Sequence, residues 1–136
     1  MSTHSSDVVV IGSGINGASS AWHLAERGLT VTVLEQDAGA AMGSTGKSAA
    51  GVRVQFTTAP NILLSLYSLP VYRSFEERYG RDIGYRDIGY LLLVPEARWD
   101  THLESVRLQH ELGAPVEVLD PDEAQQYIPF STEGLA

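Results

Sequence analysis

The stretch VVVIGSGING, residues 8–17, decides the fold of this chain. It places an apolar, β-branched segment directly before three glycines spaced G-x-G-x-x-G. A helix of small residues follows, and a second β-branched segment, residues 30–34, ends at Glu35. The glycine spacing alone is a weak signal because any glycine-rich turn can produce it, but here the strand, helix, second strand and acid are all present. The sequence therefore predicts a dinucleotide-binding βαβ unit.

Each glycine of this unit has a physical role. Gly12 allows a sharp turn off the first strand, Gly14 leaves room for a pyrophosphate beside the backbone, and Gly17 allows the helix to approach the sheet. The helix begins near Ile15, so its free N–H groups and positive dipole end face the phosphates. Gly28 is expected to end the helix in a left-handed conformation.

Glu35 lies 18 residues after Gly17, at the end of the second strand. A carboxylate at this position suits a bidentate hydrogen bond to a ribose diol, and it would repel a 2′-phosphate. The nucleotide is therefore expected to be FAD or NAD, and NADP is disfavoured.

The segment after Glu35 favours a flavin. Residues 36–52 consist largely of Gly, Ala, Ser and Thr, where a nicotinamide-type fold would continue into another helix and strand. A loop of this length without regular structure is usually functional or disordered. A flexible linker has a similar composition and remains the alternative.

Three stretches together resemble the D-amino acid oxidase-like FAD-dependent oxidoreductases, especially the sarcosine oxidase and L-proline dehydrogenase β-subunit group. They are VVVIGSGINGASSAWHLAERGLTVTVLEQ, GSTGKSAAGVRVQF and IGYLLLVPEARWDTHLE. The resemblance implies an α/β fold, with a Rossmann-like FAD-binding βαβ unit and the start of a substrate domain, incomplete relative to the full family fold. It implies an enzyme that oxidises the C–N bond of a secondary or other amino acid, such as sarcosine, proline or a D-amino acid.

The resemblance also assigns residues to the site. Arg53 matches an arginine that binds the substrate carboxylate in sarcosine oxidases, and its planar two-donor fork suits that role; a surface or structural ion pair is the alternative. No catalytic base and no metal-ligand cluster is identified. Some relatives attach flavin through a histidine after Gly-Ser-Thr, but Gly46-Lys47-Ser48 follows here, so FAD is expected to be non-covalent. The expected cofactor-binding residues are Gly12, Gly14, Ile15, Asn16, Gly17, Glu35, Gln36, Ser44, Thr45, Lys47 and Ser48.

Two domains are expected, an FAD-binding unit with its flavin loop at 1–56 and the beginning of a substrate domain at 57–136. In the second, helices are predicted at 60–79 with a kink or split at Pro70, at 96–112, and from Pro121, with strands at 90–94 and 116–119. His110 is expected on the apolar side of its helix, in the core or at an interface. Only two strands belong to the dinucleotide sheet, and two parallel strands cannot bury both faces. A second chain that completes the fold, or a homo-oligomer, is therefore expected.

The composition disfavours some classes of binding partner. A net charge of −8 and a pI near 4.8 disfavour binding to nucleic acid or to an anionic membrane. Residues 1–6 are polar and show no secretory signal, and no apolar run is long enough to span a bilayer, so a cytoplasmic location is expected. Two other classes remain open: an NAD-dependent Rossmann dehydrogenase, and a non-catalytic fragment or nucleotide-binding module.

Overall fold

The computed structural model describes residues 5–136; residues 1–4, part of the segment expected to carry no signal, lie outside the description. The chain forms two compact units, Met1–Gly51 and Val52–Ala136, here called unit 1 and unit 2. The boundary follows Gly51, so Arg53 belongs to unit 2. The expected division of function between the two segments stays a prediction.

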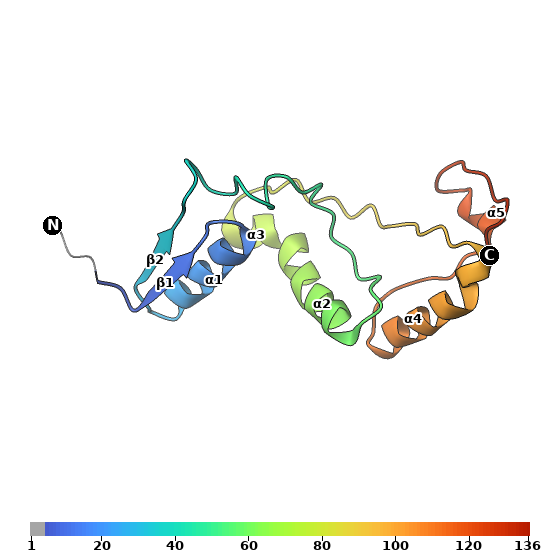
Figure 1. The fold of residues 1–136 in the computed structure, drawn as a ribbon, viewed down its shortest axis with the longest axis horizontal. Helices are drawn as coiled ribbons and strands as arrows, with labels where there is room; N and C mark the ends of the chain where they lie inside the picture. Colours follow the sequence, from blue (N-terminus) through green and yellow to red (C-terminus); the bar gives the residue numbers. More distant parts are fainter. Residues whose placement is uncertain (1–4) are drawn as a thin grey trace. The chain divides into compact units, whose positions relative to one another are not determined.

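Unit 1 is a βαβ unit. Strands β1 (Val8–Ile11) and β2 (Val31–Leu34) pair in parallel, with Val8 opposite Val31 and Ile11 opposite Leu34. Helix α1 (Ile15–Glu26) connects them and packs against both (Figure 1). The helix ends at Glu26 with Arg27 as its C-cap, and Gly28 follows with a φ of 86°, as expected. The predicted α/β class and its parallel βαβ unit are confirmed.

Hydrogen bonds to the Asp7 carboxylate link the two strands at the start of the sheet. Asp7 accepts hydrogen bonds from the Thr30 backbone N–H at 2.8 Å and from the Thr30 hydroxyl at 2.6 Å. These bonds lower the pKa of Asp7, the hydroxyl contributing most, because both donors stabilise the charged form. No residue of unit 1 from residue 5 onward is buried, and Ile11 is 87% exposed. Hydrogen bonds rather than a core therefore define the geometry of this unit.

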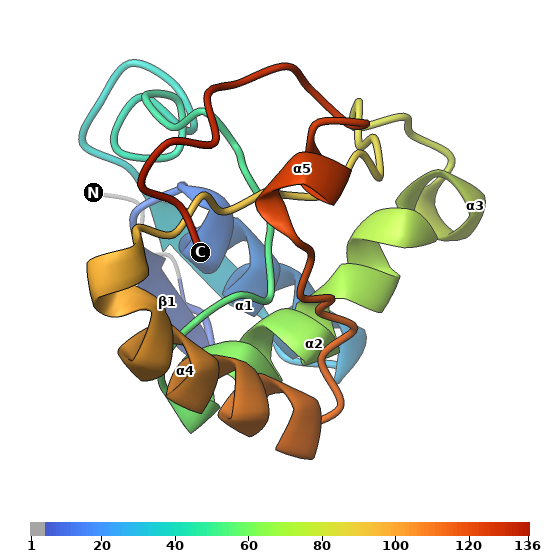
Figure 2. The same ribbon diagram turned by 90° about the vertical axis from the view of Figure 1, so that its right-hand side faces the viewer.

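Unit 2 is built around two helices. Helix α2 (Ala59–Arg73) is followed by α3 (Phe75–Tyr79), and a 3₁₀ turn η1 (Glu96–Arg98) leads into α4 (Trp99–Glu111). A short helix, α5 (Pro121–Ala124), is capped by Asp120 as predicted. Helices α2 and α4 lie in contact (Figure 2). The buried core consists of Val54, Ile62, Leu69 and Ala114.

The predicted helix at 60–79 is divided in two. Pro70 lies inside α2, and the break follows at Ser74, whose backbone N–H and hydroxyl both donate to the Pro70 carbonyl, at 3.1 and 2.7 Å. Tyr72, near the end of α2, packs against the chain beyond α3: its ring stacks on that of Tyr85, with centroids 6.1 Å apart. Gly80 ends α3 with a φ of 67°.

Two predicted strands are not present. Residues 90–94 and 116–119 have no strand partner within residues 5–136; an isolated bridge, Pro95 to Leu135, lies beside the first. A strand requires a neighbour to pair its backbone groups, and residues with strand propensity do not form one alone. Leu91, Leu92 and Leu93 are accordingly exposed.

The prediction that His110 lies in the core was also wrong, while its alternative, a position at an interface, stays a prediction. His110 is exposed, and its Nε2 lies 2.7 Å from the Val116 carbonyl oxygen. Gln109, its neighbour, is the buried residue, 2% exposed, and its amide donates to the Phe56 carbonyl at 2.8 Å. This backbone acceptor satisfies the amide nitrogen, while the buried Oε1 has no hydrogen-bond partner among the described residues.

Candidate functional site

The glycine turn has the close approaches that require glycine. Gly12 has a φ of 93°, and its N–H donates to the Leu34 carbonyl at 2.7 Å, which fixes the turn to the end of β2. A Cβ on Gly17 would overlap the Gly12 carbonyl oxygen and lie 3.4 Å from Val10 Cγ1. The first turn of α1 therefore sits directly against the end of β1.

The start of α1 presents backbone donors. Within residues 5–136, the N–H groups of Gly14, Asn16 and Gly17 donate no hydrogen bond. The N–H of Ile15 donates to the Thr45 hydroxyl oxygen at 3.0 Å. Free N–H groups at the positive end of a helix form an anion site. These donors fit a pyrophosphate, and no cationic side chain is needed.

The loop after β2 folds back onto this turn. In addition to the Thr45 contact, the Ala41 N–H donates to the Ser13 carbonyl at 3.3 Å, and the Gly46 N–H donates to the Ala41 carbonyl at 2.8 Å. Thr45 Oγ1 also lies 3.0 Å from where a Cβ on residue 14 would be. The loop therefore has a defined conformation against the turn, which an unstructured linker would lack.

The other expected loop residues lie at the surface. Ser44, Lys47 and Ser48 are exposed; Ser48 accepts a hydrogen bond from the Ala50 N–H at 3.0 Å. Within the described residues, Ser44 and Lys47 have no hydrogen bond. Their assignment to the flavin stays a prediction.

Glu35 lies at the glycine turn and is held there by three donors. Its Oε2 accepts from the Ser13 hydroxyl at 2.6 Å and from the Ser13 N–H at 2.8 Å, and its Oε1 accepts from the Asp37 N–H at 3.1 Å. These bonds lower the pKa of Glu35 from 4.5 to about 2, the Ser13 hydroxyl contributing most. Glu35 is therefore an anion at neutral pH, already oriented toward the turn.

Sequence reasoning missed Ser13. The motif treats this residue as variable, yet its side chain and backbone both bind the acid. A hydroxyl residue between the first two glycines, combined with an acid after the second strand, was the available signal.

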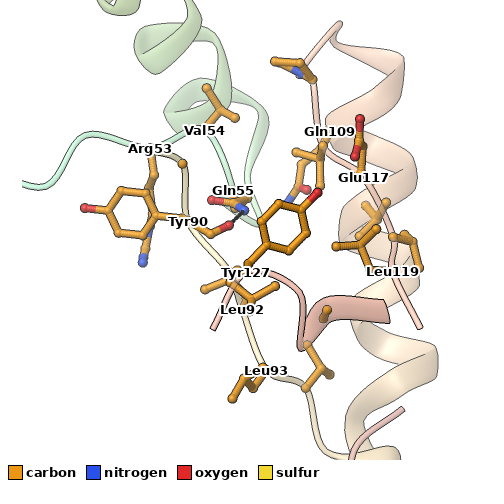
Figure 3. A pocket seen from close by; sticks show the side chains of 18 of the residues that line it. Arg53, Val54, Gln55, Tyr90, Leu92, Leu93, Gln109, Glu117, Leu119 and Tyr127 are labelled. Atoms are coloured by element: carbon orange, nitrogen blue, oxygen red, sulfur yellow. Dashed lines mark hydrogen bonds between the residues drawn. The ribbon is translucent and has the colours of Figure 1, made fainter. Parts of the chain in front are cut away.

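Arg53 lies in unit 2 beside a cavity. Its guanidinium stands over the Phe56 ring, 5.1 Å from the ring centroid, and no carboxylate of residues 5–136 forms an ion pair with it. The cavity has a volume of about 680 Å³ and is lined mainly by apolar side chains of the segments around residues 52–55, 85–94 and 115–130. Figure 3 shows this lining, with the Gln55 amide bonded to the Tyr90 carbonyl at 2.9 Å.

Two further features are absent along residues 5–136. No group of three or more His, Cys, Asp or Glu side chains there is placed to hold a metal ion. In the same part of the chain, every helix is too short or too polar to cross a bilayer.

The parallel strands, the glycine turn against α1 and the acid after β2 define a dinucleotide-binding protein of the βαβ type. A family model described as FAD dependent oxidoreductase, DAO, matches residues 7–136. The chain belongs to this family, whose members depend on FAD, and the resemblance to D-amino acid oxidase-like proteins is confirmed.

Comparison with individual relatives supports this family assignment. The chain is 34% identical to FAD-dependent oxidoreductase domain-containing protein 1 of Xenopus laevis, over 96% of this chain and 28% of the relative. It is 32% identical to a glycine oxidase of Geobacillus kaustophilus, over 98% of this chain and 38% of the relative. The solved structure of L-proline dehydrogenase from P. horikoshii superimposes with a TM-score of 0.82 at 32% identity, over 92% of this chain and 33% of that one. The chain thus spans about a third of the length of these proteins.

Proposed function

We propose that unit 1 binds FAD without a covalent bond, and that the protein acts in the oxidation of a C–N bond beside a carboxylate in an amino acid. The observation that carries the proposal is the ionised Glu35, held against a glycine turn that presents free N–H groups. Membership of an FAD-dependent family supports the cofactor. Relatives named glycine oxidase and L-proline dehydrogenase support an amino acid as substrate.

Two groups of residues bind the adenosine diphosphate part of FAD, one at its pyrophosphate and one at its ribose. The N–H groups at the start of α1 donate to the pyrophosphate, and Glu35 binds the ribose. Residues 36–53 contain no histidine or cysteine, so this loop has no side chain of the kinds that usually bond covalently to flavin. When bound, FAD supplies the hydride acceptor.

Arg53 is proposed to bind the substrate carboxylate. Its guanidinium is stacked on Phe56 and has no carboxylate partner among the described residues, so its donors are available. A planar, stacked guanidinium binds a carboxylate through two parallel hydrogen bonds. Such a contact would orient the substrate at the reacting carbon.

The visible spectrum of the purified chain reconstituted with FAD tests this function. Twin flavin bands, bleached anaerobically by sarcosine, proline or a D-amino acid, support it. Flavin bands that no amino acid bleaches favour a non-catalytic fragment or nucleotide-binding module. Binding of NAD, lost in Glu35→Ala, without any uptake of flavin would indicate a nicotinamide-dependent dehydrogenase instead.

We also propose that further polypeptide completes unit 2. Within residues 5–136, none of the N–H groups of residues 90–94 donates a hydrogen bond, and Leu91, Leu92 and Leu93 are exposed. Backbone of this kind is stabilised by an added strand. Sedimentation equilibrium with hydrogen exchange tests this: a monomer with unprotected amides at 90–94 supports the need for more polypeptide, whereas a dimer that protects them indicates a second copy.

The net charge of −8 supports two lesser proposals, that the protein binds no nucleic acid and no anionic membrane. A cytoplasmic location is proposed on the same composition. Fractionation of cells that express the protein, and binding assays with DNA and anionic vesicles, test these points.

A further inference from the structure

The acid at the proposed ribose site has few free acceptor positions. An ionised carboxylate offers about four lone-pair positions. In Glu35, Oε2 already receives two hydrogen bonds, both from Ser13, and Oε1 receives one from Asp37. About one position, on Oε1, remains for a ligand.

A ribose diol has two hydroxyl donors. One of them can donate to Glu35 Oε1, so the other needs a different acceptor at the same place. Ser13 Oγ lies 2.6 Å from Glu35 Oε2 and directs its only proton there. The two lone pairs of this hydroxyl accept no hydrogen bond from residues 5–136.

We propose that Ser13 is a second ribose-binding residue, which accepts a hydrogen bond from one hydroxyl of the adenosine ribose while Glu35 Oε1 accepts from the other. This inference rests on the proposed FAD site and differs from the expectation that Glu35 binds both hydroxyls. The Ser13 N–H and hydroxyl both donate to Glu35 Oε2, so the hydroxyl is fixed in place before the nucleotide arrives.

The arrangement also determines nucleotide selectivity. Because the Ser13 proton is directed to Glu35, the pair presents only lone pairs to a ligand. A 2′-phosphate carries negative charge and lacks the hydroxyl proton that these acceptors require. The Ser13–Glu35 pair therefore rejects 2′-phosphorylated nucleotides both by repulsion and by the lack of a donor.

Calorimetric titration of the 136-residue chain with ADP, 2′-deoxy-ADP and 3′-deoxy-ADP tests the inference. In the unsubstituted protein, each deoxy nucleotide is expected to bind about fivefold more weakly than ADP, the effect of one hydrogen bond. In Ser13→Ala, the loss for one of the two deoxy nucleotides disappears while the loss for the other persists. Ser19→Ala, which removes an exposed hydroxyl on α1, is the matched control and keeps both losses.

Three other results would refute the proposed contact between Ser13 and the ribose. If both losses shrink together in Ser13→Ala, Ser13 only positions Glu35, and a direct contact with ribose is refuted. Unchanged losses in Ser13→Ala refute any role for this hydroxyl. If the unsubstituted chain binds no ADP at all, the nucleotide site itself is refuted, which is a different failure from that of Ser13.

Discussion

The two units of this chain obtain their structure in different ways. Unit 1 has no buried residue from residue 5 onward, yet its strands, helix and turn are regular, and Asp7 and Glu35 each accept hydrogen bonds that link its segments. Unit 2 has a buried core around Ile62, but residues 90–94 and 116–119 have no strand partner among residues 5–136. The comparison shows that hydrogen bonds between neighbouring segments define the glycine turn and the two-stranded sheet of unit 1, whereas a segment without a neighbouring strand forms no sheet.

The largest expected effect is on unit 2. Ile62 is 0% exposed, and Ile62→Ala should lower the free energy of unfolding of this unit by about 2–5 kcal/mol because it leaves a cavity in the core. Chemical denaturation followed by hydrogen exchange measures it, with Leu64→Ala, at a site 65% exposed, as the control. Loss of protection in α1 as well would show that unit 1 depends on this core.

The second largest expected effect is on the stability and FAD affinity of unit 1. Gly17→Ala places a Cβ against the Gly12 carbonyl, so α1 must move away from the turn. Overpacking of this kind costs about 1–3 kcal/mol, and FAD affinity should fall accordingly. Fluorescence titration with FAD measures it, and Gly39→Ala, where a Cβ meets no atom within 4 Å, is the control. Equal affinity in Gly17→Ala would mean that the turn is not the binding element.

A smaller effect concerns the helix cap of α5. Asp120 Oδ1 accepts from the Asp122 N–H at 2.9 Å, and Asp120→Ala should destabilise this helix by about 1 kcal/mol. Hydrogen exchange of residues 122–125 should become faster, while Glu117→Ala, at an exposed neighbouring site, leaves it unchanged. No change in Asp120→Ala would show that packing of Ala124, 4% exposed, holds α5 instead.

The smallest effect is a pH dependence of unit 1. The folded pKa of Glu35, about 2, lies below its ordinary value of 4.5, so its hydrogen bonds stabilise the turn fully above pH 4.5 and are lost as the pH falls toward 2. The Ser13 amide resonance should titrate in this range by NMR. In Glu35→Gln, it should not titrate there; a persisting titration would assign the effect to another group.

Sequence reasoning succeeded where the structure is local. The glycines, the small-residue helix and Glu35 lie within 24 residues, and their spacing alone predicts the βαβ unit. The cap at Asp120 and the left-handed Gly28 followed from equally short-range rules.

Sequence reasoning failed where the structure of a segment depends on residues far away in the sequence. The segment Tyr-Leu-Leu-Leu-Val at 90–94 has strand propensity, but no neighbouring strand lies within the described residues to pair with it. Gln109 was not singled out, because the acceptor of its buried amide, the Phe56 carbonyl, lies 53 residues away in the sequence. The Ser13–Glu35 contact was missed because the motif leaves that position unspecified.

The paired acids of unit 1 have a further consequence. Asp7 with Thr30, and Glu35 with Ser13, close opposite ends of the two-stranded sheet through a carboxylate and neutral donors. Ionic strength screens an exposed ion pair such as Arg73–Asp87 in unit 2, but it has little effect on hydrogen bonds to an uncharged hydroxyl or amide. Concentrated salt should therefore leave the nucleotide-binding unit intact while it loosens the surface contacts of the other.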